Sequence, residues 1–176
     1  GSYYACCTAM RSFVSAVMAD AVRSGAILYY DLNFRRSHAH ELPALLPVIE
    51  ENMGMSTIVR GSADDFEVMY GLRDAEQIYN RHIAAHCPLF ICTSGAEAIT
   101  VCTPAGIWKF PVTPINDVVS TVGAGDNFNA GFSCALIWNG ITRSRLAQLG
   151  EAHWQQLVAT ASAFSAAACR STENYV

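Results

Sequence analysis

The sequence feature with the clearest chemical meaning is a run of small residues followed by an aspartate at the start of an apolar-periodic helix. Gly123, Ala124 and Gly125 directly precede Asp126 within the segment STVGAGDNFNAGFS (120–133). Small residues let the backbone approach a ligand closely, and the first N–H groups of a helix lack partners within it, so this junction favours an anion. A carboxylate beside a bound phosphate can accept a hydroxyl proton while the N–H groups stabilise the phosphoryl charge. The pattern indicates phosphoryl transfer.

On its spacing alone, the same segment has a plainer interpretation of equal weight. Glycine and aspartate are common at helix starts, so Asp126 can be an ordinary N-terminal cap preceded by a turn. The sequence contains no G-x-x-x-x-G-K-[ST] motif and no G-x-G-x-x-G after a predicted strand. Asp31, Asn33 and Arg35, taken by themselves, are more typical of exposed loop residues.

The elements that must position these residues alternate between strands and helices. Ser62 and Asp65 have the spacing of a capping box, which predicts the start of a helix that ends at Gly71. Short apolar runs predict strands, including a hairpin, and 3.6-residue periodicity predicts helices. The strands are expected at 26–32, 56–59, 89–93, 98–103 and 107–112, and the helices at 10–24, 42–52, 62–71, 74–85, 127–139 and 151–170. This order predicts a single α/β domain over residues 1–176, with a mostly parallel sheet and ligands at the carboxyl ends of its strands.

Composition excludes several classes of protein. Hydrophobic residues make up 52% of the 176 residues and charged residues 15%, with a net charge of −4, so the chain is neither disordered nor a basic nucleic-acid binder. No apolar run is long enough to cross a membrane. The seven cysteines form no C-x-x-C pair, which favours free thiols in the cytoplasm, and His38 and His40 beside Glu41 lack the further ligands of a metal site.

Three segments, in the same order along the chain, resemble the PfkB (ribokinase-like) carbohydrate kinases. Residues 120–131 (STVGAGDNFNAG) resemble the family's second signature, residues 31–35 (DLNFR) its D-x-N-x-R segment, and residues 89–98 (LFICTSGAEA) its strand and nucleotide loop. The resemblance implies a three-layer sandwich of the ribokinase type. It covers only the C-terminal part of a family member, so the N-terminal strands and the lid are expected to be lacking.

The resemblance also implies roles for individual residues. Asp126 would be the catalytic base, and the Gly123-Ala124-Gly125 loop the anion hole for the transferred phosphoryl group. Ser62 would contact the nucleotide phosphates, and Asp65 would hold Mg²⁺ through water. The residues expected to line the ATP site are Thr93, Ser94, Gly95 and Ala98, and those expected toward the sugar are Asp31, Asn33 and Arg35.

At four positions the chain departs from the family pattern. Ser62 stands in place of an amide, and Asp65 in place of a glutamate with a longer side chain. Ala98 replaces a glycine of the nucleotide loop, which would restrict the turn if a positive φ were needed there. Ser120 stands where many members have the aspartate that binds a monovalent cation, so potassium activation is not expected unless Asp117 substitutes.

These observations favour a cytoplasmic, ATP- and Mg²⁺-dependent kinase that phosphorylates a sugar hydroxyl. Two alternatives stay open, namely a nucleotide-binding or regulatory module with weak catalysis, and a nucleoside kinase of the same superfamily. The expected partners are a small sugar and ATP, without nucleic acid or membrane. Apolar surface left uncovered by a lid would also favour a homodimer.

Overall fold

The computed structural model describes residues 5–172 of the chain. The chain comprises two compact units, residues 1–109 and 110–176. Within the described residues, no helix combines the length and the apolar character that crossing a membrane requires. The prediction that residues 1–176 form one α/β domain stays a prediction.

The sheet has five strands in the order β1-β2-β3-β4-β5, and its first four strands lie wholly within the first unit. The strands are β1 (Tyr29–Asp31), β2 (Ile58–Ser62), β3 (Phe90–Ser94), β4 (Ala98–Thr103) and β5 (Gly106–Pro111). The pairs β1–β2 and β2–β3 are parallel, whereas β3–β4 is antiparallel. The carboxyl ends of the first three strands therefore meet at one edge of the sheet, where this class of fold binds ligands.

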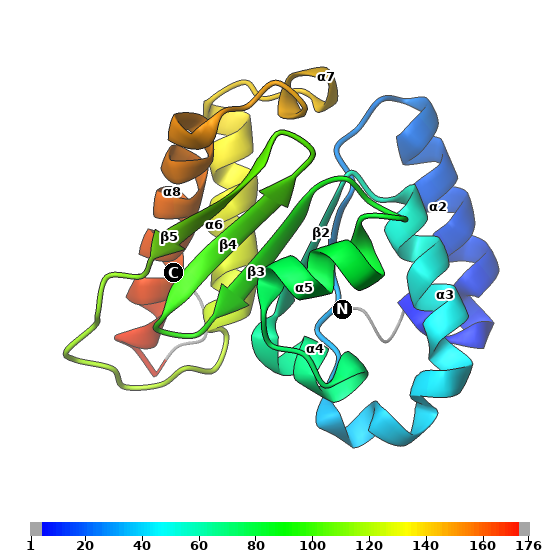
Figure 1. The fold of residues 1–176 in the computed structure, drawn as a ribbon, viewed down its shortest axis with the longest axis horizontal. Helices are drawn as coiled ribbons and strands as arrows, with labels where there is room; N and C mark the ends of the chain where they lie inside the picture. The colour runs from blue at the N-terminus through cyan, green and yellow to red at the C-terminus, as the bar shows by residue number, and fades with distance from the viewer. Residues whose placement is uncertain (1–4, 173–176) are drawn as a thin grey trace. The chain divides into compact units, whose positions relative to one another are not determined.

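Helices of the first unit cover the sheet and complete its core. They are α2 (Arg11–Arg23), α3 (Leu42–Met55), α4 (Ala63–Tyr70) and α5 (Ala75–Ile78), with 3₁₀ turns at Thr8–Met10 and Arg36–Glu41 and a π-helical segment at Tyr79–Ile83. In Figure 1, α2 and α3 lie side by side, and α4 and α5 lie in front of the strands, in agreement with contacts of α4 with β2 and β3 and of α5 with β4. Phe66 of α4 packs edge-on against Phe90 of β3, with ring centroids 5.2 Å apart.

The second unit is helical and rests on the packing of α6 (Ala124–Trp138) against α8 (Glu151–Cys169), with the short helix α7 (Arg143–Leu146) between them in sequence. Gly131 lies where α6 approaches α8, since a Cβ there would be 2.8 Å from Phe164 Cβ and 3.0 Å from Ala161 Cα. The rings of Phe132 and Trp154 stack with centroids 6.4 Å apart, and both residues are fully buried. This packing fixes the helix that begins at the glycine loop.

Most predicted elements are present, with shifted ends. The helix predicted from the capping box begins after Ser62 and ends at Gly71, whose φ is +67°. The strand predicted at 26–32 is shorter, because Leu28 O accepts hydrogen bonds from both Thr57 and Ile58 and leaves the regular ladder. The helix predicted at 74–85 narrows to α5 and then continues as the π-helical segment. The helix predicted at 127–139 begins earlier, at Ala124.

Candidate functional site

Polar side chains from three parallel strands meet at the carboxyl edge of the sheet. Asp31 ends β1, Arg60 lies opposite it in β2, and Thr93 lies near the end of β3. The Arg60 guanidinium donates from Nη1 to Asp31 Oδ1 at 3.0 Å and from Nη2 to Thr93 Oγ1 at 2.8 Å. One buried arginine therefore joins two residues that the sequence had placed on the sugar side and the nucleotide side.

Arg60 was missed by the sequence analysis. The sequence feature that could have pointed to it is a single charged residue within the otherwise uncharged run Thr57-Ile58-Val59-Arg60-Gly61. This run forms most of the buried strand β2. Only 7% of Arg60 is exposed. Burial is the largest single effect and disfavours the charged guanidinium, but Asp31, Tyr29 and Asp65 together outweigh it and raise the pKa of Arg60 above its usual value. The side chain is thus a fixed positive charge.

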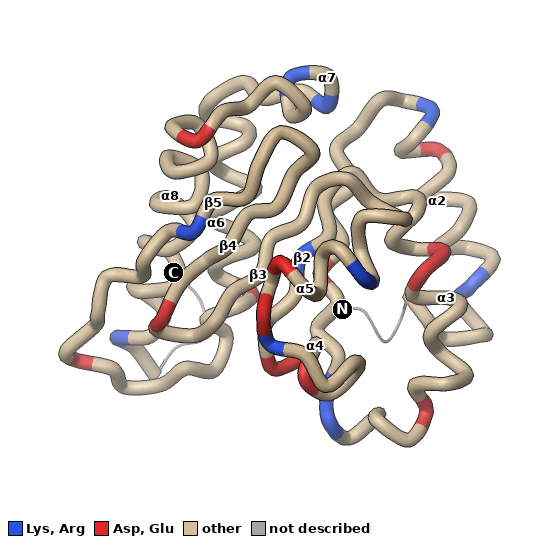
Figure 2. The backbone as a smooth tube through the Cα atoms, viewed as in Figure 1, with Lys and Arg blue, Asp and Glu red and all other residues tan. Residues whose placement is uncertain are grey.

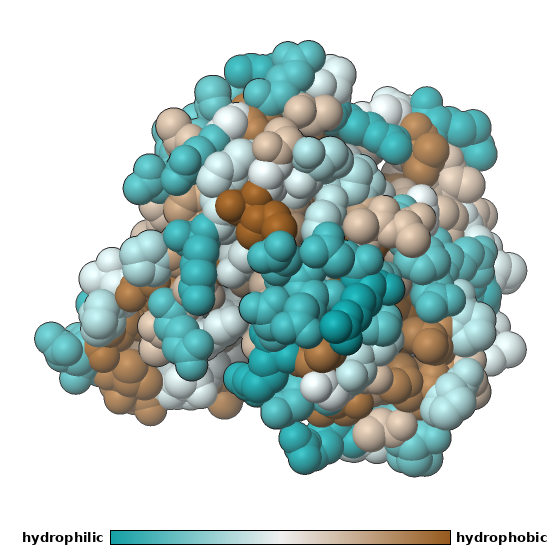
Figure 3. Space-filling view, in the orientation of Figure 1, coloured by the Kyte–Doolittle hydropathy of each residue, from teal (hydrophilic) through white to brown (hydrophobic). Residues whose placement is uncertain are grey.

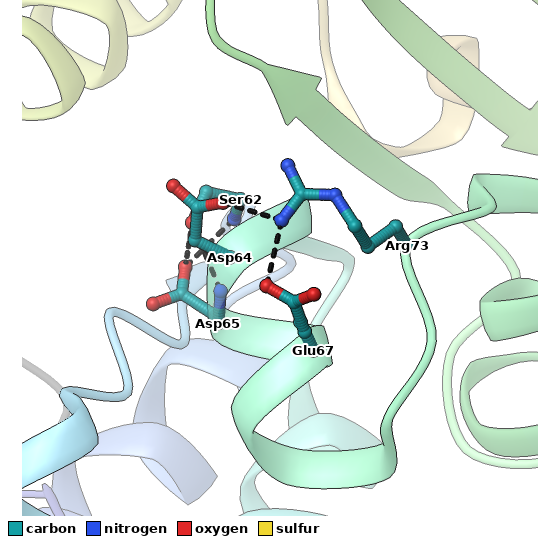
Figure 4. Close-up of polar contacts among 5 residues, drawn as sticks. All are labelled: Ser62, Asp64, Asp65, Glu67 and Arg73. Atoms are coloured by element: carbon teal, nitrogen blue, oxygen red, sulfur yellow. Dashed lines mark hydrogen bonds and ion pairs between the residues drawn. The ribbon is translucent and has the colours of Figure 1, made fainter.

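Ser62 and Asp65 form the predicted capping box at the start of α4. Ser62 N–H and Oγ–H both donate to Asp65 Oδ2, each at 2.7 Å, and Asp65 N–H donates to Ser62 Oγ at 3.1 Å. Figure 4 shows these contacts, with the second carboxylate oxygen of Asp65 pointing away from Ser62. Burial raises the pKa of Asp65, against the lowering effect of the hydrogen bonds from Ser62.

A second cluster on the same helix is exposed. Arg73 Nη1 contacts Asp64 Oδ1 at 2.7 Å and Glu67 Oε2 at 2.8 Å (Figure 4). Half of the Arg73 side chain is open to solvent, in contrast to 8% of the Arg60 side chain. The two arginines offer a matched comparison between an exposed and a buried ion pair.

The predicted nucleotide loop is the turn of the β3–β4 hairpin. Ser94 pairs with Ala98 across the two strands, and Glu97 N–H donates to Ser94 O at 2.9 Å. Gly95 supplies the left-handed residue of the turn, with a φ of +54°. Ala98 begins β4, and among the described residues Asn33 is the only non-glycine with a positive φ. The turn therefore places no glycine-specific demand on Ala98.

Asn33 and Arg35 follow β1 in the chain. Leu32 N–H still donates to Arg60 O at 2.9 Å, and at Asn33 the backbone turns, with a φ of +40°. Arg35 is exposed, and within residues 5–172 its side chain has no hydrogen bond or ion pair. Arg60 thus bonds Asp31 and Thr93 and has Asp65, the partner of Ser62, within electrostatic range, whereas Arg35 is exposed to solvent.

The glycine loop of the second unit, at the start of α6, has backbone N–H groups without hydrogen-bond acceptors in the part of the chain that the structure describes. Gly123 is the N-cap of α6 and is left-handed, with a φ of +80°. Its carbonyl oxygen accepts from Asn127 N–H and from Asn127 Nδ2, each at 2.9 Å, and Ala124 N–H donates to Thr121 O at 3.2 Å. Among the described residues the N–H groups of Gly125 and Asp126 have no acceptor, and the Asp126 side chain is exposed. Gly125 and Asp126 thus supply the free donors at this helix start.

Three other residues considered from the sequence have structural partners. Asp117 Oδ1 accepts from Arg170 Nε at 2.9 Å, and Ser120 Oγ accepts from Val122 N–H at 3.2 Å. His38 Nδ1 lies 2.8 Å from Glu41 Oε1, and no group of three metal-ligating side chains occurs in the described part of the chain. The seven cysteines are all free, as predicted, and five are buried.

Exposed apolar residues occur in both units, and one group of them lies in the segment before α6. Figure 2 shows Lys and Arg spread singly or in pairs along the chain. Three large apolar residues of the segment before α6 are exposed, namely Val118, Val119 and Val122, and Figure 3 shows apolar side chains at the surface of this segment.

Comparisons with known proteins give the family. Residues 2–175 match the pfkB family carbohydrate kinase. A fructokinase of Rhizobium leguminosarum bv. trifolii is 29% identical over 134 residues, which are 75% of this chain and 40% of that protein.

Solved structures give the fold. Aminoimidazole riboside kinase from Salmonella enterica, complexed with aminoimidazole riboside and an ATP analog, matches 98% of this chain and 55% of its own length, with a TM-score of 0.78 and 23% identity. Fructokinase from Xylella fastidiosa with bound ATP matches 97% of this chain and 54% of its own, with a TM-score of 0.81 and 18% identity. The predicted ribokinase-like α/β fold is confirmed, and the chain spans about half the length of these kinases. By the match over residues 2–175, the chain belongs to the pfkB family of carbohydrate kinases.

Proposed function

We propose that the protein is an ATP-dependent kinase that transfers the γ-phosphate of ATP to a sugar hydroxyl, with Asp126 as general base. The observation that carries the proposal is the start of α6, where the unpartnered N–H groups of Gly125 and Asp126 adjoin an exposed carboxylate. The similarity to a fructokinase supports a sugar as the acceptor.

The proposed reaction uses these groups in two ways. The Asp126 carboxylate takes the proton of the sugar hydroxyl, whose oxygen forms a bond to the γ-phosphorus while the bond from that phosphorus to the β–γ bridging oxygen breaks and ADP leaves. The N–H groups of Gly125 and Asp126, with the dipole of α6, stabilise negative charge on the phosphoryl oxygens. Gly123 supports this arrangement because its left-handed backbone and engaged carbonyl orient the first turn.

Residues of the first unit are assigned to binding. Thr93, Ser94, Gly95 and Ala98 are proposed to line the nucleotide site, with Ser62 at the phosphates. Asp31, Asn33 and Arg35 are proposed to lie toward the sugar. The exposed guanidinium of Arg35, which has no ion pair among the described residues, is available to an anionic group.

The residues at the start of α4 fit a Mg²⁺ ion held through water. Asp65 Oδ2 is used by Ser62, whereas Oδ1 accepts no hydrogen bond from any described residue and can accept one from a metal-bound water. When bound, Mg²⁺ would neutralise charge on the ATP phosphates. Ser62 orients the Asp65 carboxylate through its two hydrogen bonds.

Three further properties belong to the proposal. The free cysteines fit a reducing compartment such as the cytoplasm. Potassium activation is not expected, since Asp117 is paired with Arg170 and Ser120 caps the turn before α6. The exposed valines Val118, Val119 and Val122 favour a homodimer.

The test compares Asp126→Asn with Glu151→Gln in the protein. Glu151 is likewise an exposed acid in the first turn of a helix, α8, so it controls for loss of a helix-terminal charge. ADP release would be measured by a coupled assay with fructose, a panel of other free sugars and adenosine, and ATP·Mg²⁺ binding by calorimetry. The proposal predicts that Asp126→Asn lowers turnover by at least about 10²-fold with ATP binding kept, whereas Glu151→Gln is unchanged.

Each alternative outcome has a distinct signature. ATP binding without turnover on any acceptor would favour a nucleotide-binding module. Consumption of adenosine but of no free sugar would favour a nucleoside kinase. Sugar phosphorylation retained by Asp126→Asn would remove Asp126 from the role of base.

A further inference from the structure

Arg60 has a placement that its local sequence does not require. It lies in the middle of the buried strand β2. Its guanidinium bonds Asp31 of β1 on one side and Thr93 of β3 on the other. These are the two neighbouring strands in the sheet order, so one side chain spans three strands at their ligand-binding ends. Gly61, the next residue, leaves room for the ring of Phe66, since a Cβ there would be 2.6 Å from Phe66 Cε2.

Stability alone does not account for a charge at this position. Removing a guanidinium from water carries a large desolvation cost, and an ion pair of this kind often contributes no more than well-packed apolar residues would. The other residues of β2 are Ile58, Val59, Gly61 and Ser62, so an apolar residue would continue the buried pattern. The charge therefore calls for a role beyond packing.

Direct contact with a substrate is not that role, because the Arg60 side chain is only 8% exposed and two of its nitrogens are bonded to protein atoms. Arg60 acts instead on acidic groups around it. Asp31 is bonded to it, and Asp65 lies within electrostatic range of both. Two carboxylates near a phosphate-binding edge would repel an anionic nucleotide, and a buried cation between them reduces that repulsion.

We infer that Arg60 is a positioning residue that fixes Asp31 and Thr93 relative to one another and compensates the acidic charge of the strand ends, so that acceptor and nucleotide bind in a coupled way. This role rests on the proposed kinase function. Arg60 touches neither substrate and acts through the two residues to which it is bonded.

The test uses Arg60→Met, Arg60→Lys, Thr93→Val and the double variant Arg60→Met/Thr93→Val in the protein. KM for ATP·Mg²⁺, KM for the best sugar, kcat and the thermal midpoint would be measured for each. Arg60→Met is expected to raise both KM values by roughly tenfold or more, because loss of fixed geometry weakens binding at both segments. Arg60→Lys retains a charge that can reach one partner and is expected to recover part of the loss.

The double variant separates a positioning role from a merely structural one, because only a positioning role makes the effects of the two substitutions on KM non-additive. If Arg60 acts through Thr93, the double variant should raise the KM for ATP·Mg²⁺ no more than the worse single variant. Arg73→Met is the control, since Arg73 pairs with two carboxylates but is exposed, and it should leave both KM values unchanged. If Arg60→Met does not fold, the same comparison of single and double variants is made with Arg60→Lys, Thr93→Val and Arg60→Lys/Thr93→Val.

The failures are distinguishable. Unchanged KM values in folded Arg60 variants, or KM increases that multiply in the double variant, would overturn the positioning role while the kinase function stands. Absence of both ATP binding and turnover in the unsubstituted protein would overturn the proposed function, and this role with it.

Discussion

Substitution by alanine of two helical glycines, Gly131 and Gly54, should change the free energy of unfolding in opposite directions. Gly131 lies in α6 where a Cβ would be 2.8 Å from Phe164 Cβ and Cγ and 3.0 Å from Ala161 Cα. These atoms belong to or adjoin the backbone of α8, so relief of the overlap requires the two helices to separate. Gly54 lies in α3, and a Cβ there would meet nothing within 4 Å.

The magnitudes follow from two opposing effects. Alanine is favoured over glycine within a helix by about 1 kcal/mol, and this gain applies at both positions. Overpacking costs typically about 1–3 kcal/mol, and it applies only at Gly131, where the nearest atoms cannot swing away as a side-chain end can. Gly131→Ala is thus expected to destabilise the chain by up to about 2 kcal/mol, whereas Gly54→Ala stabilises it by up to about 1 kcal/mol.

Urea denaturation monitored by circular dichroism measures both free energies of unfolding under one set of conditions. Thermal midpoints should move in opposite directions, by roughly 2–4 °C for each kcal/mol in a chain of this size. If Gly131→Ala stabilised the chain as much as Gly54→Ala, the close approach of α6 and α8 would be wrong. The position of the helix that begins at the glycine loop would then be in error as well.

Three further predictions concern the sheet edge and α4. Ser62→Ala removes both hydrogen bonds of the Ser62 hydroxyl, the one it donates to Asp65 Oδ2 and the one it accepts from Asp65 N–H, so it should lower the free energy of unfolding by about 1 kcal/mol. Thr142→Ala, at an N-cap whose hydroxyl contacts Ser144 Oγ but makes no hydrogen bond to a helix N–H, should lower it much less, and equal losses would contradict the capping geometry. Because burial raises the pKa of Asp65 above 3.8, its ionised form is disfavoured in the folded state, so stability is lost as the pH rises through the window between the unfolded and folded pKa values. Urea midpoints of wild type and Asp65→Asn would be measured at pH 7 and at lower pH values approaching that window. As the pH falls, the stability of wild type should rise relative to that of Asp65→Asn, and a difference that does not change with pH would refute the burial of Asp65. Arg60→Met leaves Asp31 partly buried without its cation and should cost about 3 kcal/mol or more, whereas Arg73→Met should barely change the denaturation midpoint, and similar shifts for both would contradict the contrast in burial.

Local signals made much of the fold predictable. Ser62 and Asp65 satisfy one another's backbone within a single turn, and Gly71 ends that helix in a left-handed conformation that glycine adopts without strain. The β4–β5 hairpin was likewise predicted from adjacent segments, and the two strands are neighbours in the sheet. Features fixed by neighbours in sequence are visible in the sequence.

Features that depend on a partner in another strand, or on the exact hydrogen bonding of a turn, were not predictable in the same way. Arg60 is meaningful only because β1 and β3 bring Asp31 and Thr93 to either side of it. Whether Ala98 is strained depends on the register of the β3–β4 hairpin, which places Gly95 at the left-handed position. At the glycine loop, residue type indicated an anion site, but the hydrogen bond from Ala124 N–H to Thr121 O leaves Gly125 and Asp126 as the free donors.

The central claim is that phosphate reaches a sugar hydroxyl through deprotonation by Asp126. It is tested most directly by following the labelled γ-phosphate of ATP into sugar phosphate or into free phosphate, with wild type and Asp126→Asn side by side. Wild type should give labelled sugar phosphate in one-to-one ratio with ADP, and Asp126→Asn should give none above background. Equal labelling of the sugar by both proteins would contradict it.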